Sequence, residues 1–248
     1  MDQVLLVTGA SRGIGAACAL LAASRGWKVA VNYTANAQAA QEVVARIGAA
    51  GGTALAIQAD VAQENQVMAM FETIDAKLGR LSGLVNNAGV VDATSRVEQM
   101  TVARLKRMFD INVIGSIVCA REAVLRMSTS HGGAGGSIVN LSSAASRLGA
   151  PGQYVDYAAA KGAIDAFTIG LAKEVAGEGI RVNAVRPGLI ETDIHASGGL
   201  PDRVRDLAHQ VPMKRGGSAQ EVAQAVVWLL SKEASYTTMS LVDVSGGR

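Results

Sequence analysis

Short apolar runs alternate along the chain with longer segments in which apolar residues recur at helical spacing. The runs show little polar alternation, which is typical of strands buried on both faces of a parallel sheet. We predict strands at residues 4–8, 28–33, 53–58, 81–87, 136–143, 179–188 and 240–247. We predict helices at 13–26, 36–50, 64–78, 101–127, 154–177 and 218–231.

This alternation predicts an α/β fold with a doubly wound, Rossmann-type topology, in which a central parallel sheet of about seven strands carries helices on both faces. No shift in composition marks a domain boundary, and no internal repeat is present. The glycine-rich stretch at 132–136 is too short to link two domains. We therefore expect one domain over residues 1–248.

Composition and charge exclude several classes of protein. The net charge of +2, without a basic block, gives no support for binding to nucleic acid or to a membrane surface. Cys18 and Cys119 lie far apart, and the three histidines lack the spacing of metal ligands, so we expect neither a disulfide nor a metal site. The N-terminus does not resemble a signal peptide, and no apolar run is long enough to span a membrane. We expect a cytoplasmic protein.

A glycine-rich turn, VTGASRGIG at 7–15, joins the first predicted strand to the first predicted helix. Gly9, Gly13 and Gly15 allow a sharp turn and a close approach of the backbone to a ligand. The helix that follows offers unpaired N–H groups and the positive end of its dipole. This combination favours binding of the pyrophosphate of a dinucleotide.

The end of the second predicted strand indicates which dinucleotide. NAD-binding folds usually carry an acidic residue there for the ribose 2′-hydroxyl. Here the strand ends at Asn32-Tyr33, and no Asp or Glu occurs between Asp2 and Glu42. Arg12 lies in the glycine turn and can pair with a 2′-phosphate. The sequence therefore favours NADP(H) over NAD(H).

The segment YVDYAAAKG at 154–162 contains candidate acid–base chemistry. Tyr157 and Lys161 are four residues apart and share one face of a helix, whereas Tyr154 lies about 10 Å further along the axis. A cationic neighbour favours the phenolate and lowers the pKa of a tyrosine. Tyr157 could then exchange protons with a substrate oxygen, with Lys161 as its partner.

The motifs TGASRGIG, NNAG, N-x-x-G, Ser-Ser and Y-x-x-x-K occur in this order, and with them the whole chain resembles the short-chain dehydrogenase/reductase family. Within it, the chain is most similar to the branch of bacterial ketoacyl-carrier-protein reductases and glucose dehydrogenases. This resemblance implies hydride transfer between NAD(P) and a carbonyl or an alcohol.

The resemblance also implies catalytic roles. Tyr157 would be the acid/base, and Lys161 would lower its pKa and hold the ribose hydroxyls of the nicotinamide. Asn112 would anchor a water linked to the lysine, and Ser143 would hydrogen-bond the substrate oxygen. Ser143 lies 14 residues before Tyr157, one more than in many members, so Ser142 is an alternative.

A cofactor site is implied by the same resemblance, at the glycine turn, the ends of the following strands and the segment after 187. Its predicted members are Gly9, Ser11, Arg12, Gly13, Ile14, Gly15, Asn32, Tyr33, Asp60, Val61, Asn87, Ala88, Gly89, Pro187, Gly188, Ile190 and Thr192.

Three further residues and two helices carry expectations. We expect Tyr154 near the substrate pocket, while His195 could contact substrate or lie in a solvated loop. Met239 stands where family members commonly have glycine, which could alter the last strand or a subunit contact. The apolar helices at 101–127 and 154–177 imply a homodimer or homotetramer.

The sequence thus predicts an NADP(H)-dependent oxidoreductase that interconverts a small-molecule carbonyl and a secondary alcohol. The alternative is a regulatory protein that senses NADP(H) without turnover. A serine hydrolase using Ser143 and Lys161 fits poorly, because no G-x-S-x-G elbow surrounds the serine. The identity of the substrate stays open.

Overall fold

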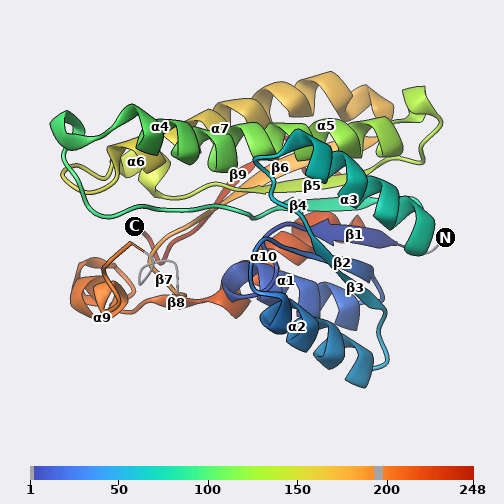
Figure 1. Ribbon diagram of the computed structural model, residues 1–248, viewed down its shortest axis with the longest axis horizontal. Coiled ribbons are helices and arrows are strands. Elements are labelled where there is room, and N and C mark those ends of the chain that lie inside the picture. The colour runs from blue at the N-terminus through green and yellow to red at the C-terminus, as the bar shows by residue number, and fades with distance from the viewer. Residues whose placement is uncertain (1–2, 193–197) are drawn as a thin grey trace.

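Seven parallel strands form the central sheet of the computed structural model, which describes residues 3–192 and 198–248 (Figure 1). Their order is β3-β2-β1-β4-β5-β6-β9, which confirms the predicted doubly wound α/β fold. The strands are β1 (Val4–Val7), β2 (Lys28–Tyr33), β3 (Ala54–Gln58), β4 (Gly83–Asn86), β5 (Gly136–Leu141), β6 (Ile180–Pro187) and β9 (Leu241–Val244).

Helices cover both faces of this sheet, as Figure 1 shows. One face packs against α1 (Gly13–Ser24), α2 (Ala37–Ala49) and α10 (Ala219–Leu230). The other packs against α3 (Glu64–Lys77), α5 (Gly115–Met127) and α7 (Val155–Val175).

Strand β1 explains why the apolar runs lack alternation. Leu5 and Val7 belong to the core under α1, α2 and α10, whereas Val4 and Leu6 belong to the core under α3, α5 and α7. Successive side chains of a strand point to opposite faces, so a strand covered on both sides is apolar at every position.

The predicted single helix at 101–127 is wrong in detail. It consists of α4 (Val102–Phe109), a π-helical turn (Asp110–Ile114) and α5. The π turn accommodates one extra residue within a single turn of the helix. Such a turn leaves no mark in the apolar spacing, and the sequence therefore did not reveal it.

Several short elements were not predicted either. They are a second sheet of β7 (Ile190–Glu191) and β8 (Gly217–Ser218), the helices α6 (Ala145–Leu148) and α9 (Arg203–Leu207), and the 3₁₀ turns Val97–Gln99, Thr129–His131, Ala176–Glu178, Ala208–Gln210 and Lys232–Ala234.

Met239, which precedes β9, has a left-handed backbone with φ of 63°. Its N–H donates to the carbonyl of Val182 at 2.7 Å, which holds the turn against β6. A non-glycine residue in this conformation costs roughly 1–2 kcal/mol, which gives a physical reason for glycine at this position in related chains. The turn still leads into β9, which pairs with β6 in parallel.

The strand order reverses between β1 and β4. From β1 the next strands, β2 and β3, are added toward one edge of the sheet, whereas from β4 the next strands, β5 and β6, are added toward the other edge. In doubly wound folds the carboxyl ends of the strands at such a point flank the ligand-binding crevice. The glycine turn follows β1 and the NNAG turn follows β4, so both predicted cofactor segments lie at this crevice.

Candidate active site

The glycine turn after β1 is packed too closely for side chains. Gly9 and Gly13 have φ of 62° and 57°, a region that other residues rarely adopt. A Cβ at Gly15 would lie 2.5 Å from the Asn87 amide nitrogen and 2.6 Å from the Gly9 carbonyl oxygen. Helix α1 begins at Gly13, and its N-cap residue Arg12 makes no side-chain cap bond. The first N–H groups of α1 are therefore open to the oxygens of a ligand.

Three polar side chains hold this turn in place. The Asn87 amide donates to the carbonyls of Thr8 at 2.8 Å and Gly9 at 3.0 Å. The Thr8 hydroxyl accepts the backbone N–H groups of Asn87 and Ala88. The Asn32 side chain accepts from the Gly9 N–H at 3.1 Å and donates to the carbonyl beyond β3. Asn32 and Asn87 thus use their side chains to support the turn.

The other predicted cofactor residues at this edge lie at the ends of β2 and β3. Tyr33 packs against the core beneath α1. Val61 is buried against Gly115, and a Cβ on that glycine would lie 2.8 Å from the Val61 side chain. The Asp60 carboxylate accepts the Ala62 N–H at 3.0 Å. Arg12 is exposed, and Ser11 lies beside it in the turn.

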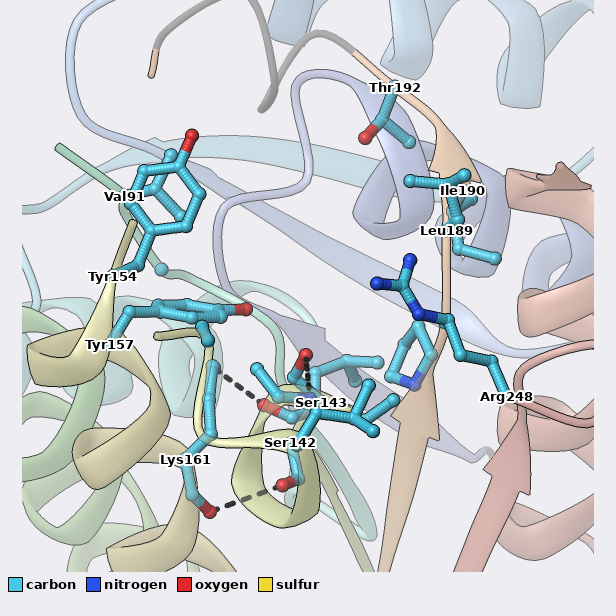
Figure 2. A pocket seen from close by; sticks show the side chains of 18 of the residues that line it. Val91, Ser142, Ser143, Tyr154, Tyr157, Lys161, Leu189, Ile190, Thr192 and Arg248 are labelled. Atoms are coloured by element: carbon cyan, nitrogen blue, oxygen red, sulfur yellow. Dashed lines mark hydrogen bonds between the residues drawn. The ribbon is translucent and has the colours of Figure 1, made fainter. Parts of the chain in front are cut away.

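A cavity of about 460 Å³ opens beside the glycine turn (Figure 2). It brings together residues from segments far apart in the sequence. The predicted residues that line it are Ile14, Asn87, Gly89, Ser143, Tyr157, Lys161, Pro187, Gly188, Ile190 and Thr192. The Thr192 methyl would lie 3.5 Å from a Cβ on Gly13, so the segment after β6 closes against the glycine turn.

Tyr157, Lys161 and Ser143 converge on one wall of this cavity. The Lys161 ammonium lies 5.5 Å from the centre of the Tyr157 ring and donates to the Leu141 carbonyl at 2.7 Å. Ser143 forms a hydrogen bond with Tyr157 and accepts the N–H of Ala145 at 3.1 Å.

The two adjacent serines differ in orientation. The Ser142 hydroxyl donates to the Lys161 backbone carbonyl at 3.2 Å, and its side chain is buried against α7. Ser143, one residue later, is the one that contacts Tyr157. Of the two serines left open by the sequence, the geometry therefore favours Ser143 for contact with a substrate oxygen.

Burial shifts the pKa values of the pair. The surrounding protein raises the pKa of Tyr157 to about 12, although its ring is partly open to the cavity, and the bond to Ser143 lowers it only in part. Burial lowers the pKa of Lys161 to about 8 against the opposing effect of Asp165. The expectation that Lys161 lowers the pKa of Tyr157 is therefore wrong for the protein without a bound cofactor. Loss of hydration raises the pKa of the phenol, while the Lys161 ammonium is directed at the Leu141 carbonyl.

Asn112 lies in the π turn and is fully buried. Its amide donates to the carbonyls of Met108 at 2.9 Å and Val90 at 3.1 Å, and its oxygen accepts the Val90 N–H at 3.2 Å. A Cβ at Gly89 would lie 2.7 Å from the Asn112 oxygen and 3.6 Å from the Lys161 nitrogen. Asn112 and Lys161 therefore lie on either side of Gly89, where the lack of a Cβ leaves room for both side chains.

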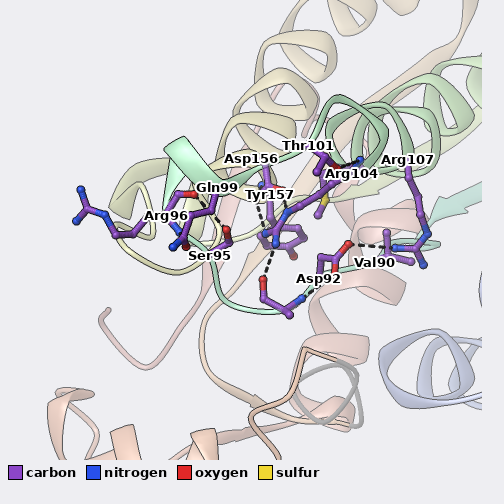
Figure 3. Close-up of polar contacts among 12 residues, drawn as sticks. Val90, Asp92, Ser95, Arg96, Gln99, Thr101, Arg104, Arg107, Asp156 and Tyr157 are labelled. Carbon is purple, nitrogen blue, oxygen red and sulfur yellow. Dashed lines mark hydrogen bonds and ion pairs between the residues drawn. The ribbon is translucent and has the colours of Figure 1, made fainter.

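An ion pair that the sequence did not reveal lies next to Tyr157 (Figure 3). The Arg104 guanidinium contacts the fully buried Asp156 carboxylate at 2.7 Å and donates to the Ala93 carbonyl at 2.6 Å. Asp156 also accepts the Tyr157 N–H at 3.0 Å. The pair thus connects α4, the loop beyond β4 and the first turn of α7. Asp156 had a local signal, as an acid in a first helical turn, but Arg104 had none.

The remaining candidates separate clearly. Tyr154 is 5% exposed and lines the cavity, whereas His195 lies outside the described residues.

Cys18 and Cys119 are buried and unpaired, and burial raises the pKa of each thiol to about 12, so neither is an activated nucleophile. Within residues 3–192 and 198–248, no three metal-ligating side chains gather, and no helix has the length and apolarity to cross a membrane.

Replacement of Arg104 by methionine is expected to lower the free energy of unfolding by about 3–5 kcal/mol, because Asp156 is left buried without its cation. Urea denaturation measures the change. The matched control is Arg107→Met, whose partner Asp92 is exposed and 3.7 Å away, with an expected change below about 1 kcal/mol. Equal effects of the two variants would contradict this account of the pair.

The raised pKa of Tyr157 can be measured directly in the protein without cofactor. The ultraviolet tyrosinate absorbance of the wild type minus that of Tyr157→Phe is expected to be near zero at pH 10, where a free tyrosine is about half ionised. A difference signal with a midpoint below pH 10 would show that Lys161, rather than burial, controls the phenol.

The comparisons with known proteins agree with this arrangement. The family model described as Enoyl-(Acyl carrier protein) reductase matches residues 9–248. The chain is 58% identical to a protein named uncharacterized oxidoreductase YgfF of Escherichia coli, over 99% of both chains. It is 38% identical to the 3-oxoacyl-acyl-carrier-protein reductase FabG of Staphylococcus aureus, over 100% of this chain and 98% of the relative.

A solved structure supports the same conclusion. The chain matches a short-chain type dehydrogenase/reductase from Mycobacterium marinum with a TM-score of 0.93 at 34% identity, over 99% of this chain and 94% of the other. The chain therefore belongs to the short-chain dehydrogenase/reductase family of oxidoreductases, within the branch that contains the bacterial 3-oxoacyl-acyl-carrier-protein reductases.

Proposed function

We propose that the chain is an NADP(H)-dependent oxidoreductase that interconverts a carbonyl and a secondary alcohol, with Tyr157 as the acid/base. The observation that carries the proposal is the meeting of Tyr157, Ser143 and Lys161 on one wall of a cavity that the glycine turn flanks. Family membership sets the reaction class, and this cluster supplies the groups that the class requires.

The residues around α1 fit a dinucleotide. A turn with positive φ at Gly9 and Gly13 and no room for a Cβ at Gly15 lets a pyrophosphate approach the backbone, and the N–H groups at the start of α1 are uncapped. Pro187, Gly188, Ile190 and Thr192 would then border the nicotinamide. When bound, the nicotinamide supplies or accepts the hydride.

The chain's own side chains would handle the proton. Carbonyl reduction develops negative charge on the substrate oxygen, which needs a hydrogen-bond donor and a proton. Ser143 accepts the N–H of Ala145 and carries one O–H, which can donate to that oxygen. With its pKa raised to about 12, Tyr157 holds its proton at neutral pH and can deliver it. Lys161, next to the phenol ring, would favour the phenolate that results.

Specificity for the 2′-phosphate rests on the end of β2. The last two residues of the strand are Asn32, whose buried side chain supports the glycine turn, and Tyr33, and neither carries a carboxylate. Arg12 is exposed at the mouth of the turn. A 2′-phosphate would meet a guanidinium there and no repelling acid, which supports NADP(H) over NAD(H).

An oligomer is part of the proposal. Apolar side chains on α4, the π turn and α5 are exposed, among them Val102 at 72% and Ile114 at 51%. A second copy of the chain that covered these helices would bury them, as in a homodimer or homotetramer.

Tyr157→Phe is expected to lower kcat/KM for NADPH-dependent reduction by about 10²–10⁴-fold, because the proton donor is lost. The measurement is NADPH consumption over a panel of carbonyl compounds, with NADPH affinity measured in parallel. Tyr236→Phe, at a fully exposed position, is the matched control and should leave the rate unchanged.

Undiminished turnover in Tyr157→Phe would disprove the role of that residue. Tight NADPH binding by the wild type without turnover of any carbonyl or alcohol would instead favour an NADP(H) sensor.

Arg12→Ala is expected to weaken NADPH binding by about tenfold, the loss typical of a single charge-assisted hydrogen bond, and to leave NADH binding nearly unchanged. Calorimetric titration of both cofactors measures this difference. Arg25→Ala, at the opposite end of α1, controls for the loss of one positive charge. An equal loss for both cofactors, or tighter binding of NADH by the wild type, would overturn the assignment of Arg12.

A further inference from the structure

Two arginines that the sequence did not single out line the same cavity as Tyr157 and Ser143. Arg203 is the first residue of α9, and Arg248 follows β9. Both are half-buried. In Figure 2 the guanidinium of Arg248 extends into the cavity from the side opposite Tyr157. The fold thus brings two cations from separate segments to the cavity that holds the proposed proton donor.

Within residues 3–192 and 198–248, neither guanidinium pairs with an Asp or Glu side chain. Among the described residues, no Asp or Glu lines the cavity, and no ion pair involves Arg203 or Arg248. The arginines around them are paired: Arg147 with Asp243, Arg205 with Asp202 and Asp206, and Arg215 with Glu221. An arginine without a counter-charge is therefore a feature of the cavity, and not of this end of the molecule in general.

Both arginines are held in position. The Arg203 guanidinium lies 5.3 Å from the centre of the Tyr154 ring, a cation–π distance, and Tyr154 is itself buried. The backbone oxygen of Arg248 accepts hydrogen bonds from Arg147 at 3.2 Å and from the Ser245 hydroxyl at 2.8 Å. Less side-chain and backbone freedom remains to be lost when a ligand binds.

The two charges also act on each other. Burial lowers the pKa of Arg203, and the neighbouring charge of Arg248 lowers it further. Arg203 stays protonated at neutral pH, because a free guanidinium titrates far above it. Two partly desolvated cations in one cavity, with no Asp or Glu side chain among its described lining residues, create a positive potential that an anionic group would relieve.

The phosphates of the cofactor do not account for these arginines. The nicotinamide end of the cofactor would share the cavity, beside Pro187 and Gly188, but the phosphates would lie at the glycine turn, and Gly9, Gly13 and Gly15 do not line this cavity. The lining of the cavity is largely apolar and includes Val91, Leu148, Pro151 and Leu189. This composition suits a short carbon chain with a charged end.

We propose that the carbonyl substrate carries an anionic group, a carboxylate or a phosphate, which Arg203 and Arg248 bind while its carbonyl oxygen contacts Ser143 and Tyr157. This inference rests on the proposed function and narrows its substrate class. The cavity then selects substrates by the separation between the carbonyl and the charge.

The test uses matched pairs of carbonyl compounds with the full-length protein and NADPH. Pyruvate, acetoacetate and levulinate place a carboxylate at increasing distance from a ketone, and their ethyl esters remove the charge. Dihydroxyacetone phosphate against dihydroxyacetone tests a phosphate. For the pair of the best length, kcat/KM is expected to be at least about tenfold higher for the anion, as for one charged hydrogen bond.

Arg203→Gln and Arg248→Gln should each lower the anion-to-neutral ratio of kcat/KM by about 10–100-fold, mainly through KM. Arg205→Gln is the matched control, since it lies on α9 with its charge already paired at the surface, and it should leave the ratio unchanged. Equal use of anionic and neutral partners, or a ratio that neither variant alters, would overturn the proposal and leave the reductase assignment intact.

If no carbonyl is turned over, the proposed function fails, and the anion site is then tested by binding alone. Calorimetric titration of the wild type and of the Arg203→Gln/Arg248→Gln double variant with butyrate and with inorganic phosphate provides this measurement. Binding of either anion that the double variant loses would support the site. Absence of binding, or equal binding by the two proteins, would overturn it.

Discussion

The site depends on how closely the turn after β1 approaches the turn after β4. The Asn87 amide and the Thr8 hydroxyl hold the two turns together with hydrogen bonds of 2.8–3.0 Å. The space at Gly15 is smaller than a methyl group, because a Cβ would lie 2.5 Å from that amide. Helix α1 begins at this contact, so the contact also fixes where its open N–H groups lie relative to the cavity. If the turns after β1 and β4 lay further apart, the start of α1 would move away from the cavity.

The sequence was sufficient for the sheet and the main helices, because their signals are local. Strands covered on both faces must be apolar throughout, as Leu5 and Leu6 illustrate by entering opposite cores. The sequence was not sufficient for the break within 102–127. A π turn adds a residue without changing the apolar composition, and the predicted long helix therefore ran through it.

The same distinction applies to the candidate site. The glycine turn and the Tyr157–Lys161 spacing are local patterns, and the structure brings both to one cavity. The choice between the two adjacent serines required the backbone that turns Ser142 toward α7. The sign of the Tyr157 pKa shift required knowledge of burial, which spacing along a helix does not provide. Arg203 and Arg248 were missed, because nothing in the sequence relates two arginines that lie 45 positions apart.

The π turn that carries Asn112 makes this site sensitive to the length of the chain as well as to its chemistry. A π turn holds one residue more than an α-helical turn, so loss of any one residue from 110–114 would convert it into an ordinary turn of an unbroken helix. Hydrogen bonding along the helix would survive such a deletion. The amide that reaches Val90 and Met108 would not stay in place. A single-codon deletion here would therefore separate folding from function, an outcome that few substitutions in the buried sheet could produce.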